Sequence, residues 1–251
     1  FSYISSGLAD MVLFSGAERF DSPGQILEWD NSRGEFKHPI FWASIFSKSY
    51  KREFGVSNED LAVVSVKNHK HAQKNPNALS KKTYTVEDVI NSKKLTDDLR
   101  LLDCSRPCTG GASILLASEE MSKKISDEPI WISGIGQKTT SAGFTKNESL
   151  FSMNSTKIAS ESALKMANQN IKQIDVAEIH DAFSVCEPMA LEALGFSKPG
   201  EGINLIKKLH ETNDFKINSR GGLIGCGHPL GATGISQTIE KFYIIKANIY
   251  I

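Results

Sequence analysis

The sequence predicts a layered α/β protein whose sheets are mainly parallel. Short apolar runs alternate with amphipathic stretches of helical period, and the alternation occurs twice along the chain. The apolar runs are about four to five residues long, which is typical of strands covered on both faces. A chain of 251 residues that is 40% hydrophobic can also bury a substantial core. We expect one lobe over residues 1–125, with a polar loop region over about 21–98, and a second lobe over 126–251.

Composition excludes several classes of function. The 29 basic and 29 acidic side chains cancel, which gives no electrostatic basis for binding nucleic acid or an anionic membrane. No apolar run approaches the ~20 residues that a membrane-spanning helix needs. The four cysteines lack the spacing of a metal site and indicate reduced thiols, so we expect a cytoplasmic protein without a bound metal. The two chain ends are typical of an internal portion of a longer protein.

The first lobe is expected to begin with the end of a helix, a turn at Gly7 and a buried strand from Met11 to Ser15. Helices should follow near 39–54 and 57–74, the second with Leu61, Val64 and Val66 facing inward. Segment 99–118 predicts a short strand, a tight turn and a second buried strand over 113–117.

Two histidines of the second helix, His69 and His71, are two positions apart. Residues at this spacing point in different directions on a helix, so we interpret them as solvated or packing side chains and not as ligands.

The second lobe should open with a strand over 129–133. A helix follows that places Ala159, Ala163, Met166 and Ala167 on one face, with Asn154 or Ser155 as its cap. A strand over 176–179 comes next, and then a helix to Leu194 that ends at Gly195. The last predicted helix begins near Pro229 or Gly231.

Residues 218–234 combine six glycines with His228 and one proline. Such a segment must turn sharply or lie close to something, and it precedes a predicted helix. An imidazole and a negatively charged intermediate can both be accommodated there. A purely structural turn is the alternative. A phosphate loop is disfavoured, because the glycine spacing is not G-x-G-x-x-G and no G-K-[ST] follows.

The string N-S-R-G-G-L-I-G-C-G-H-P-L-G-A-T-G over 218–234 closely resembles the histidine motif of thiolases. E-I-H-D-A-F around His180 resembles the H-D-x-F motif of the archaeal and sterol-carrier-protein branches, as do K-N-H-K-H-A at 67–72 and T-V-E-D-V at 85–89. The resemblance implies the thiolase-like αβαβα layered fold with two similar lobes. Residues 1–20 resemble the segment that follows the nucleophile helix, so the nucleophilic cysteine is expected upstream of this chain.

The resemblance also implies an activity, acyl transfer to or from coenzyme A, as in an acetyl-CoA C-acyltransferase. His228 would activate the nucleophilic cysteine and donate to the thioester oxygen, and His180 would supply the other oxyanion donor. Gly227 would contact the substrate. Ala182 stands where related motifs carry a cysteine, which makes Cys186 a candidate second acid/base, although a buried structural thiol is the favoured interpretation. The 251-residue chain alone is expected to be inactive.

By the same resemblance we expect a homodimer. We also consider a small zinc-ribbon/OB-fold partner and hydroxymethylglutaryl-CoA synthase as partners. Coenzyme A esters would be substrates, and no cofactor is expected. The alternative is a thiolase-like protein that binds acyl-CoA or a partner without catalysis. Ala182 and Gly110, which replaces the aspartate usual in the family, favour it.

Overall fold

The computed structural model describes residues 1–20, 38–141, 146, 149–212, 214 and 216–246. The chain divides into two compact units, and each is described by itself. The first unit comprises Phe1–Asp21, Pro107–Ser133 and Pro229–Tyr250, and the second comprises Ser22–Arg106 and Gly134–His228. The lobe boundary expected near residue 125 stays a prediction.

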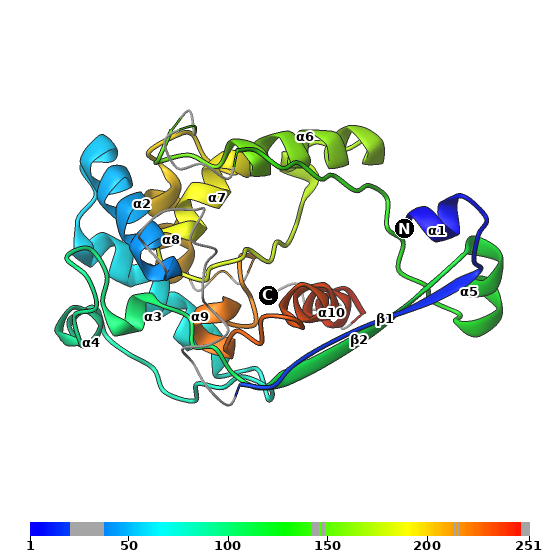
Figure 1. Ribbon diagram of the computed structural model, residues 1–251, viewed down its shortest axis with the longest axis horizontal. Helices are drawn as coiled ribbons and strands as arrows, with labels where there is room; N and C mark the ends of the chain where they lie inside the picture. Colours follow the sequence, from blue (N-terminus) through cyan, green and yellow to red (C-terminus); the bar gives the residue numbers. More distant parts are fainter. Residues whose placement is uncertain (21–37, 142–145, 147–148, 213, 215, 247–251) are drawn as a thin grey trace. The chain divides into compact units, whose positions relative to one another are not determined.

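The first unit is built on a two-stranded sheet. Its elements are α1 (Ser2–Ser5), β1 (Met11–Glu18), β2 (Gly110–Ala117), α5 (Glu119–Ile125) and α10 (Thr233–Lys246). The strands pair antiparallel, with Leu13 opposite Leu115, and lie side by side in Figure 1. Helix α10 contacts both strands. Before it begins, the Gly231 N–H donates to the Glu18 carboxylate at 3.0 Å.

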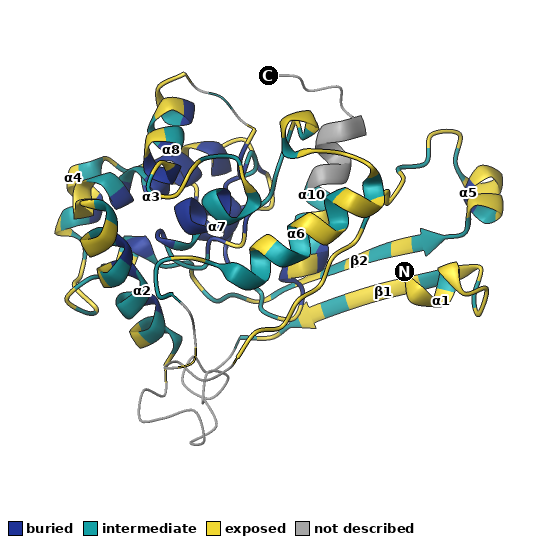
Figure 2. Cartoon of the chain, turned by 90° about the horizontal axis from the view of Figure 1, so that it is seen from above, coloured by how far each residue is buried: buried dark blue, intermediate teal, exposed yellow. Residues whose placement is uncertain are grey.

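The strands of the first unit differ from the expectation in pairing and in burial. The predicted strands at 11–15 and 113–117 both exist, but they are antiparallel. Exposed and less exposed residues alternate along β2 (Figure 2), and Leu13 and Leu115 are 68% and 51% exposed. The expectation that both faces are covered was therefore wrong. An apolar run indicates that a strand is favoured, but it does not identify the strand with which it pairs.

The second unit is predominantly helical. Its helices are α2 (Pro39–Phe54), α3 (Asn58–Ala72), α4 (Val86–Asn91), α6 (Asn154–Ala167), α7 (Cys186–Leu194), α8 (Gly202–Glu211), α9 (Gly222–Cys226) and the short 3-10 turns at Leu101–Asp103 and Ile171–Gln173. The predictions of α2, α3 and the end of α7 are confirmed, and Leu61 and Val64 of α3 are buried as expected, whereas Val66 is only partly buried. Ser57 begins α3 with a capping box that includes Asp60. Gly195 ends α7 in the left-handed conformation, with φ 89°.

Several expected strands are not formed in the second unit or at its border. Segments 129–133 and 176–179 are not strands, and Ala177 makes only a single parallel bridge to Ile217. The segment that begins at residue 99 forms a 3-10 turn at Leu101–Asp103 where a strand was predicted. Strands need neighbours for their backbone hydrogen bonds, and sequence periodicity does not supply a neighbour. Across the described residues, the expectation of mainly parallel sheets is therefore wrong.

Two helix details also correct the sequence analysis. Met153 is the N-cap of α6 without a side-chain hydrogen bond, in place of the expected Asn154 or Ser155. Met166 of the same helix is 51% exposed, so it does not share the packed face. Helix α10 begins at Thr233, later than expected.

The hydrophobic core of the second unit lies among α2, α3, α7 and α8. Tyr50, Leu61, Met189, Leu191 and Ile206 are among its buried members. The buried parts of these helices are dark blue in Figure 2. Helix α3 is central, because it contacts α4, α8 and α9. Within the ranges that the structure describes, every helix is too short or too polar to cross a bilayer.

Candidate functional site

The structure brings together the two histidines that the sequence singled out, and both lie in the second unit. The imidazole centroids of His180 and His228 are 5.0 Å apart, and the rings meet edge to face at 82°. His180 is exposed, whereas His228 is only 9% exposed. One histidine is therefore accessible to a ligand while its neighbour is largely shielded from water.

The backbone around Gly227 determines where His228 lies. Helix α9, which the sequence analysis did not predict, ends at Cys226. Gly227 then adopts φ 95° and ψ 165°, a conformation that favours glycine. The His228 N–H next donates to the carbonyl oxygen of Arg106 at 2.8 Å. The histidine therefore leaves a short helix through a glycine and is anchored by its own backbone. Whether Gly227 contacts a substrate stays a prediction.

The environment of His228 controls its protonation. Burial, followed by the proximity of His180, lowers the pKa of His228 to about 4. The imidazole is therefore neutral near pH 7, a form in which one ring nitrogen can accept a hydrogen bond and the other can donate one. A neutral histidine of this kind can accept a proton or stabilise a developing negative charge.

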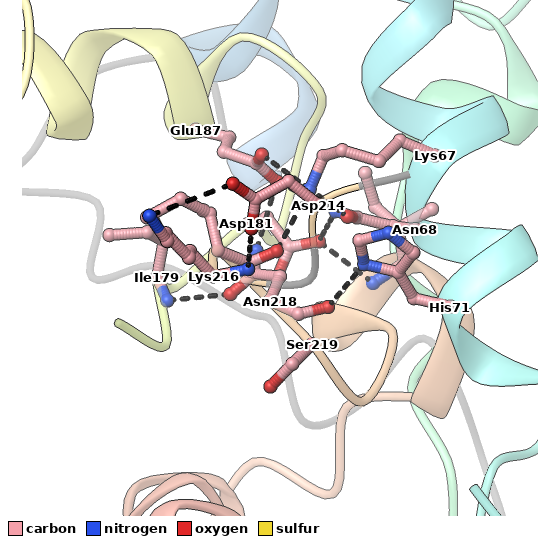
Figure 3. Close-up of polar contacts among 12 residues, drawn as sticks. Lys67, Asn68, His71, Ile179, Asp181, Glu187, Asp214, Lys216, Asn218 and Ser219 are labelled. Atoms are coloured by element: carbon pink, nitrogen blue, oxygen red, sulfur yellow. Dashed lines mark hydrogen bonds and ion pairs between the residues drawn. The ribbon is translucent and has the colours of Figure 1, made fainter. Parts of the chain in front are cut away.

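A buried polar cluster, which we define as Lys67, Asn68, Asp181, Glu187 and Asn218, includes the residue that follows His180 in the chain (Figure 3). All five residues have 0% relative exposure. Lys67 pairs with Glu187 at 2.8 Å (Nζ to Oε1). The Asn68 side-chain amide donates to Asp181 and to Glu187 at 2.7 Å each, and Asn218 donates to Glu187 at 2.9 Å. These contacts join α3, α7 and the segments that precede α7 and α9.

Asp181 connects the segment of His180 to the helix that leads to His228. One carboxylate oxygen of Asp181 accepts the Leu223 N–H at 2.6 Å, and the other accepts the Ile224 N–H at 3.3 Å. A Cβ added to Gly222 would lie 2.3 Å from this carboxylate, so only glycine fits. Burial, together with the charge of Glu187, raises the pKa of Asp181 to about 7, while the two backbone donors and Lys67 act in the opposite direction.

His69 and His71 are buried and not solvated, so of the two interpretations given by the sequence, packing is confirmed. The His71 Nδ1 is 3.0 Å from the carbonyl oxygen of Asn218, and the His69 ring packs edge-on against Tyr84. Sequence reasoning missed Lys67 and its neighbours in the buried polar cluster. The sequence does carry a pattern that could have indicated this cluster. Positions 64, 67, 68 and 71 lie on one face of α3, and three of these four residues are polar.

Two of the cysteines, Cys104 and Cys186, lie in surroundings that disfavour their thiolate forms. Burial, aided by nearby carboxylates, raises the pKa values of Cys104 and Cys186 to about 12. The Cys226 thiol donates to the Arg220 carbonyl oxygen at 2.9 Å. An acid/base role for Cys186 stays a prediction, and its raised pKa agrees better with a structural thiol.

Comparison with known proteins identifies close relatives. Residues 136–248 match the family described as "Thiolase C-terminal domain-like". An acetyl-CoA acetyltransferase of Methanothermobacter thermautotrophicus is 34% identical over 97% of this chain and 66% of its own length. Sterol carrier protein 2 of Gallus gallus is 33% identical over 97% of this chain and 49% of its own length. The chain thus spans about two thirds of the archaeal relative and half of the avian one.

Solved structures share the fold. The "Ltp2-ChsH2(DUF35) aldolase" structure aligns with a TM-score of 0.84 and 23% identity, over 97% of this chain and 66% of that chain. A monomeric SCP2-thiolase-like protein type 1 from Mycobacterium smegmatis aligns with a TM-score of 0.74 and 17% identity, over 95% of this chain and 51% of that chain. At these identities the likeness concerns the fold alone.

Proposed function

Because this chain belongs to the thiolase family, we propose that it is the histidine-bearing part of a thiolase-type acyltransferase. The proposed reaction is CoA-dependent cleavage of a 3-ketoacyl-CoA, or the reverse condensation of acetyl-CoA. The observation that carries the proposal is the edge-to-face pair of His180 and His228, with ring centroids 5.0 Å apart. The complete protein would have the two similar lobes of the αβαβα fold.

Thioester chemistry assigns a role to each histidine. A thiolate must take the acyl group, which requires a base, and the thioester oxygen becomes an oxyanion, which requires donors that already point at it. In the proposal, His228 accepts the thiol proton of the nucleophilic cysteine. A ring N–H of His180 and one of His228 then stabilise the oxyanion. Near pH 7 the His228 ring is neutral, which is the form that accepts a proton, and the lowered pKa makes it a weaker base than an exposed histidine.

The nucleophilic thiol is proposed to come from polypeptide outside the 251 residues. Burial raises the pKa values of Cys104 and Cys186 to about 12, which disfavours the thiolate form of both near pH 7. The archaeal relative is also longer than this chain, which covers 66% of it. We therefore expect no CoA-dependent cleavage of acetoacetyl-CoA by the 251-residue chain. Measurable cleavage would contradict an external nucleophile.

The role of His228 is tested in the complete protein by replacing it with alanine. His228→Ala should abolish thiolysis of acetoacetyl-CoA and leave the dissociation constant for coenzyme A nearly unchanged. His38→Asn is the matched control, because His38 caps α2 by accepting the Ile40 N–H and asparagine is also a good cap. Retained turnover in His228→Ala would refute the assignment of the base.

A second candidate function is binding of acyl-CoA or of a partner protein without catalysis. The presence of Ala182, where related motifs carry a cysteine, favours it, as do the raised thiol pKa values. One measurement distinguishes the catalytic function from the binding function. A complete protein that binds coenzyme A but does not cleave acetoacetyl-CoA, even with His180 and His228 intact, would support the binding function.

The proposed function also includes an oligomeric state and partner proteins for the complete protein. We propose a homodimer and, in addition, a small partner protein of the zinc-ribbon/OB-fold class, with hydroxymethylglutaryl-CoA synthase as a further candidate. The support for a small partner is indirect: one solved structure of the same fold, the Ltp2-ChsH2(DUF35) aldolase, is named for an assembly with a DUF35 protein. Co-purification followed by light scattering of the complete protein would test both the dimer and the partner.

A further inference from the structure

We propose that Asp181 is a positioning residue that fixes His228 relative to His180. The effect of Asp181 on catalysis rests on the proposed function. Its effect on the placement of the His228 ring relative to the His180 ring does not. Asp181 follows His180 directly in the chain, and its carboxylate is bonded to the helix that ends one residue before Gly227-His228. One side chain thus links two histidine segments that are far apart in sequence.

The hydrogen bonds of Asp181 define the link. Its Oδ1 accepts the Leu223 N–H at 2.6 Å, and its Oδ2 accepts the Ile224 N–H at 3.3 Å. The Asn68 amide donates to Oδ2 at 2.7 Å. All three partners are donors, so the arrangement requires two acceptor oxygens. A carboxylate provides them, whereas an amide would direct an N–H against a donor.

The surroundings leave the carboxylate little freedom to move. Asp181 has 0% relative exposure, and the absence of a side chain at Gly222 creates the space that its oxygens occupy. Asn218 supports the same segment from the other side, because its side-chain oxygen accepts the Ile179 N–H at 2.7 Å. The residues on both sides of His180 are therefore held by side chains of the buried polar cluster (Figure 3).

Glu187 provides the comparison that separates positioning from stability. It belongs to the same cluster and is equally buried, but its partners are Lys67, Asn68 and Asn218 and not the backbone of α9. If the cluster only stabilised the fold, loss of either carboxylate would have similar consequences. If Asp181 positions the histidines, Asp181→Asn alone should disturb the ring pair.

The test is histidine NMR on the 251-residue chain, which contains six histidines. The ring protons of His180 and His228 should give a nuclear Overhauser cross-peak in the wild type, because the rings meet edge to face at 5.0 Å. We expect Asp181→Asn to abolish this cross-peak and Glu187→Gln to retain it, in samples shown to be folded by circular dichroism. A retained cross-peak in Asp181→Asn, or equal loss in both variants, would overturn the proposal.

A second pair of variants covers the case in which Asp181→Asn does not fold. Gly222→Ala leaves the Asp181 side chain unaltered but places a Cβ 2.3 Å from its oxygen, which displaces the carboxyl group from α9. Gly55→Ala is its control, because Gly55 also has a positive φ, 67° against 56°, and nothing lies within 4 Å of an added Cβ. Loss of the cross-peak only in Gly222→Ala supports the proposal, and retention in both variants contradicts it.

Kinetics of the complete protein connect the geometry to catalysis. Misplacement of a catalytic group by about 1 Å can cost on the order of 100-fold in rate. We expect Asp181→Asn to lower kcat to this extent with little change in KM, and Gly55→Ala, which lies outside the buried polar cluster, to leave kcat within a few-fold of the wild type. If the complete wild-type protein does not cleave acetoacetyl-CoA while the NMR result holds, the proposed function fails and the positioning role stands.

Discussion

Replacement of Lys67 by methionine should strongly destabilise the second unit. Lys67 and Glu187 both have side-chain exposures of 0%, and their charged atoms are 2.8 Å apart. Lys67 also donates to the Asn68 side chain at 2.6 Å and to the Ile217 carbonyl oxygen at 3.2 Å. The methionine fills a similar volume but leaves a buried carboxylate without its cation.

The expected magnitude follows from the burial. Removing one partner of a buried ion pair costs about 3–5 kcal/mol, because the remaining charge is desolvated and uncompensated. In a domain of this size, about 1 kcal/mol shifts Tm by roughly 2–4 °C, so we expect Tm to fall by roughly 6–20 °C. Urea unfolding followed by circular dichroism gives the free energy directly.

A double variant and a surface control sharpen the prediction. In Lys67→Met/Glu187→Gln both charges are gone, so the double variant should be more stable than the sum of the single effects predicts by about 2 kcal/mol or more. Lys123→Met is the control: Lys123 and its partner Glu119 are 64% and 71% exposed, and its loss should cost less than about 0.5 kcal/mol. A loss below about 1 kcal/mol for Lys67→Met, or strict additivity in the double variant, would refute the reasoning.

Two further predictions concern packing and pH. Gly225→Ala would place a Cβ 2.7 Å from the Ala72 Cβ, and overpacking of this kind should cost about 1–3 kcal/mol in urea unfolding. Gly234→Ala, where nothing lies within 4 Å, should be neutral, and equal losses would show that Gly225 is not a packing site. Burial, with the charge of Lys67, lowers the pKa of His71 to about 3, so its contribution to stability is complete above the unfolded value of 6.5 and is lost as the pH falls toward 3. Between about pH 7 and pH 5 the contribution of His71 should fall by about 2 kcal/mol. His71→Gln should therefore reduce the pH dependence of the unfolding free energy by about that amount. An unchanged pH dependence in this variant would contradict the prediction.

Local physical chemistry determined much of the helical structure and the identity of the two histidines. Helix α2 begins at Pro39, where proline suits the first turn, and α7 ends at Gly195, whose positive φ disfavours other residues. The glycines around His228 indicated a special backbone, and Gly227 adopts one. The helix ends and the backbone conformation at Gly227 depend on residues that are close together in the sequence, so they can be predicted from the sequence alone.

The tertiary structure decided the strand pairing and the surroundings of the histidines. The run beginning at Met11 forms a strand, but its antiparallel partner lies at Gly110–Ala117, and local periodicity carries no information about that pairing. Segment 129–133 is also rich in apolar residues and forms no strand, because no neighbour among the described residues pairs with it. Lys67 and Asp181 are charged residues that a sequence places at the surface by default, and they are buried because partners distant in sequence satisfy them. Burial with a partner depends on the whole chain, which is why only the three-dimensional structure shows how the two histidines are held.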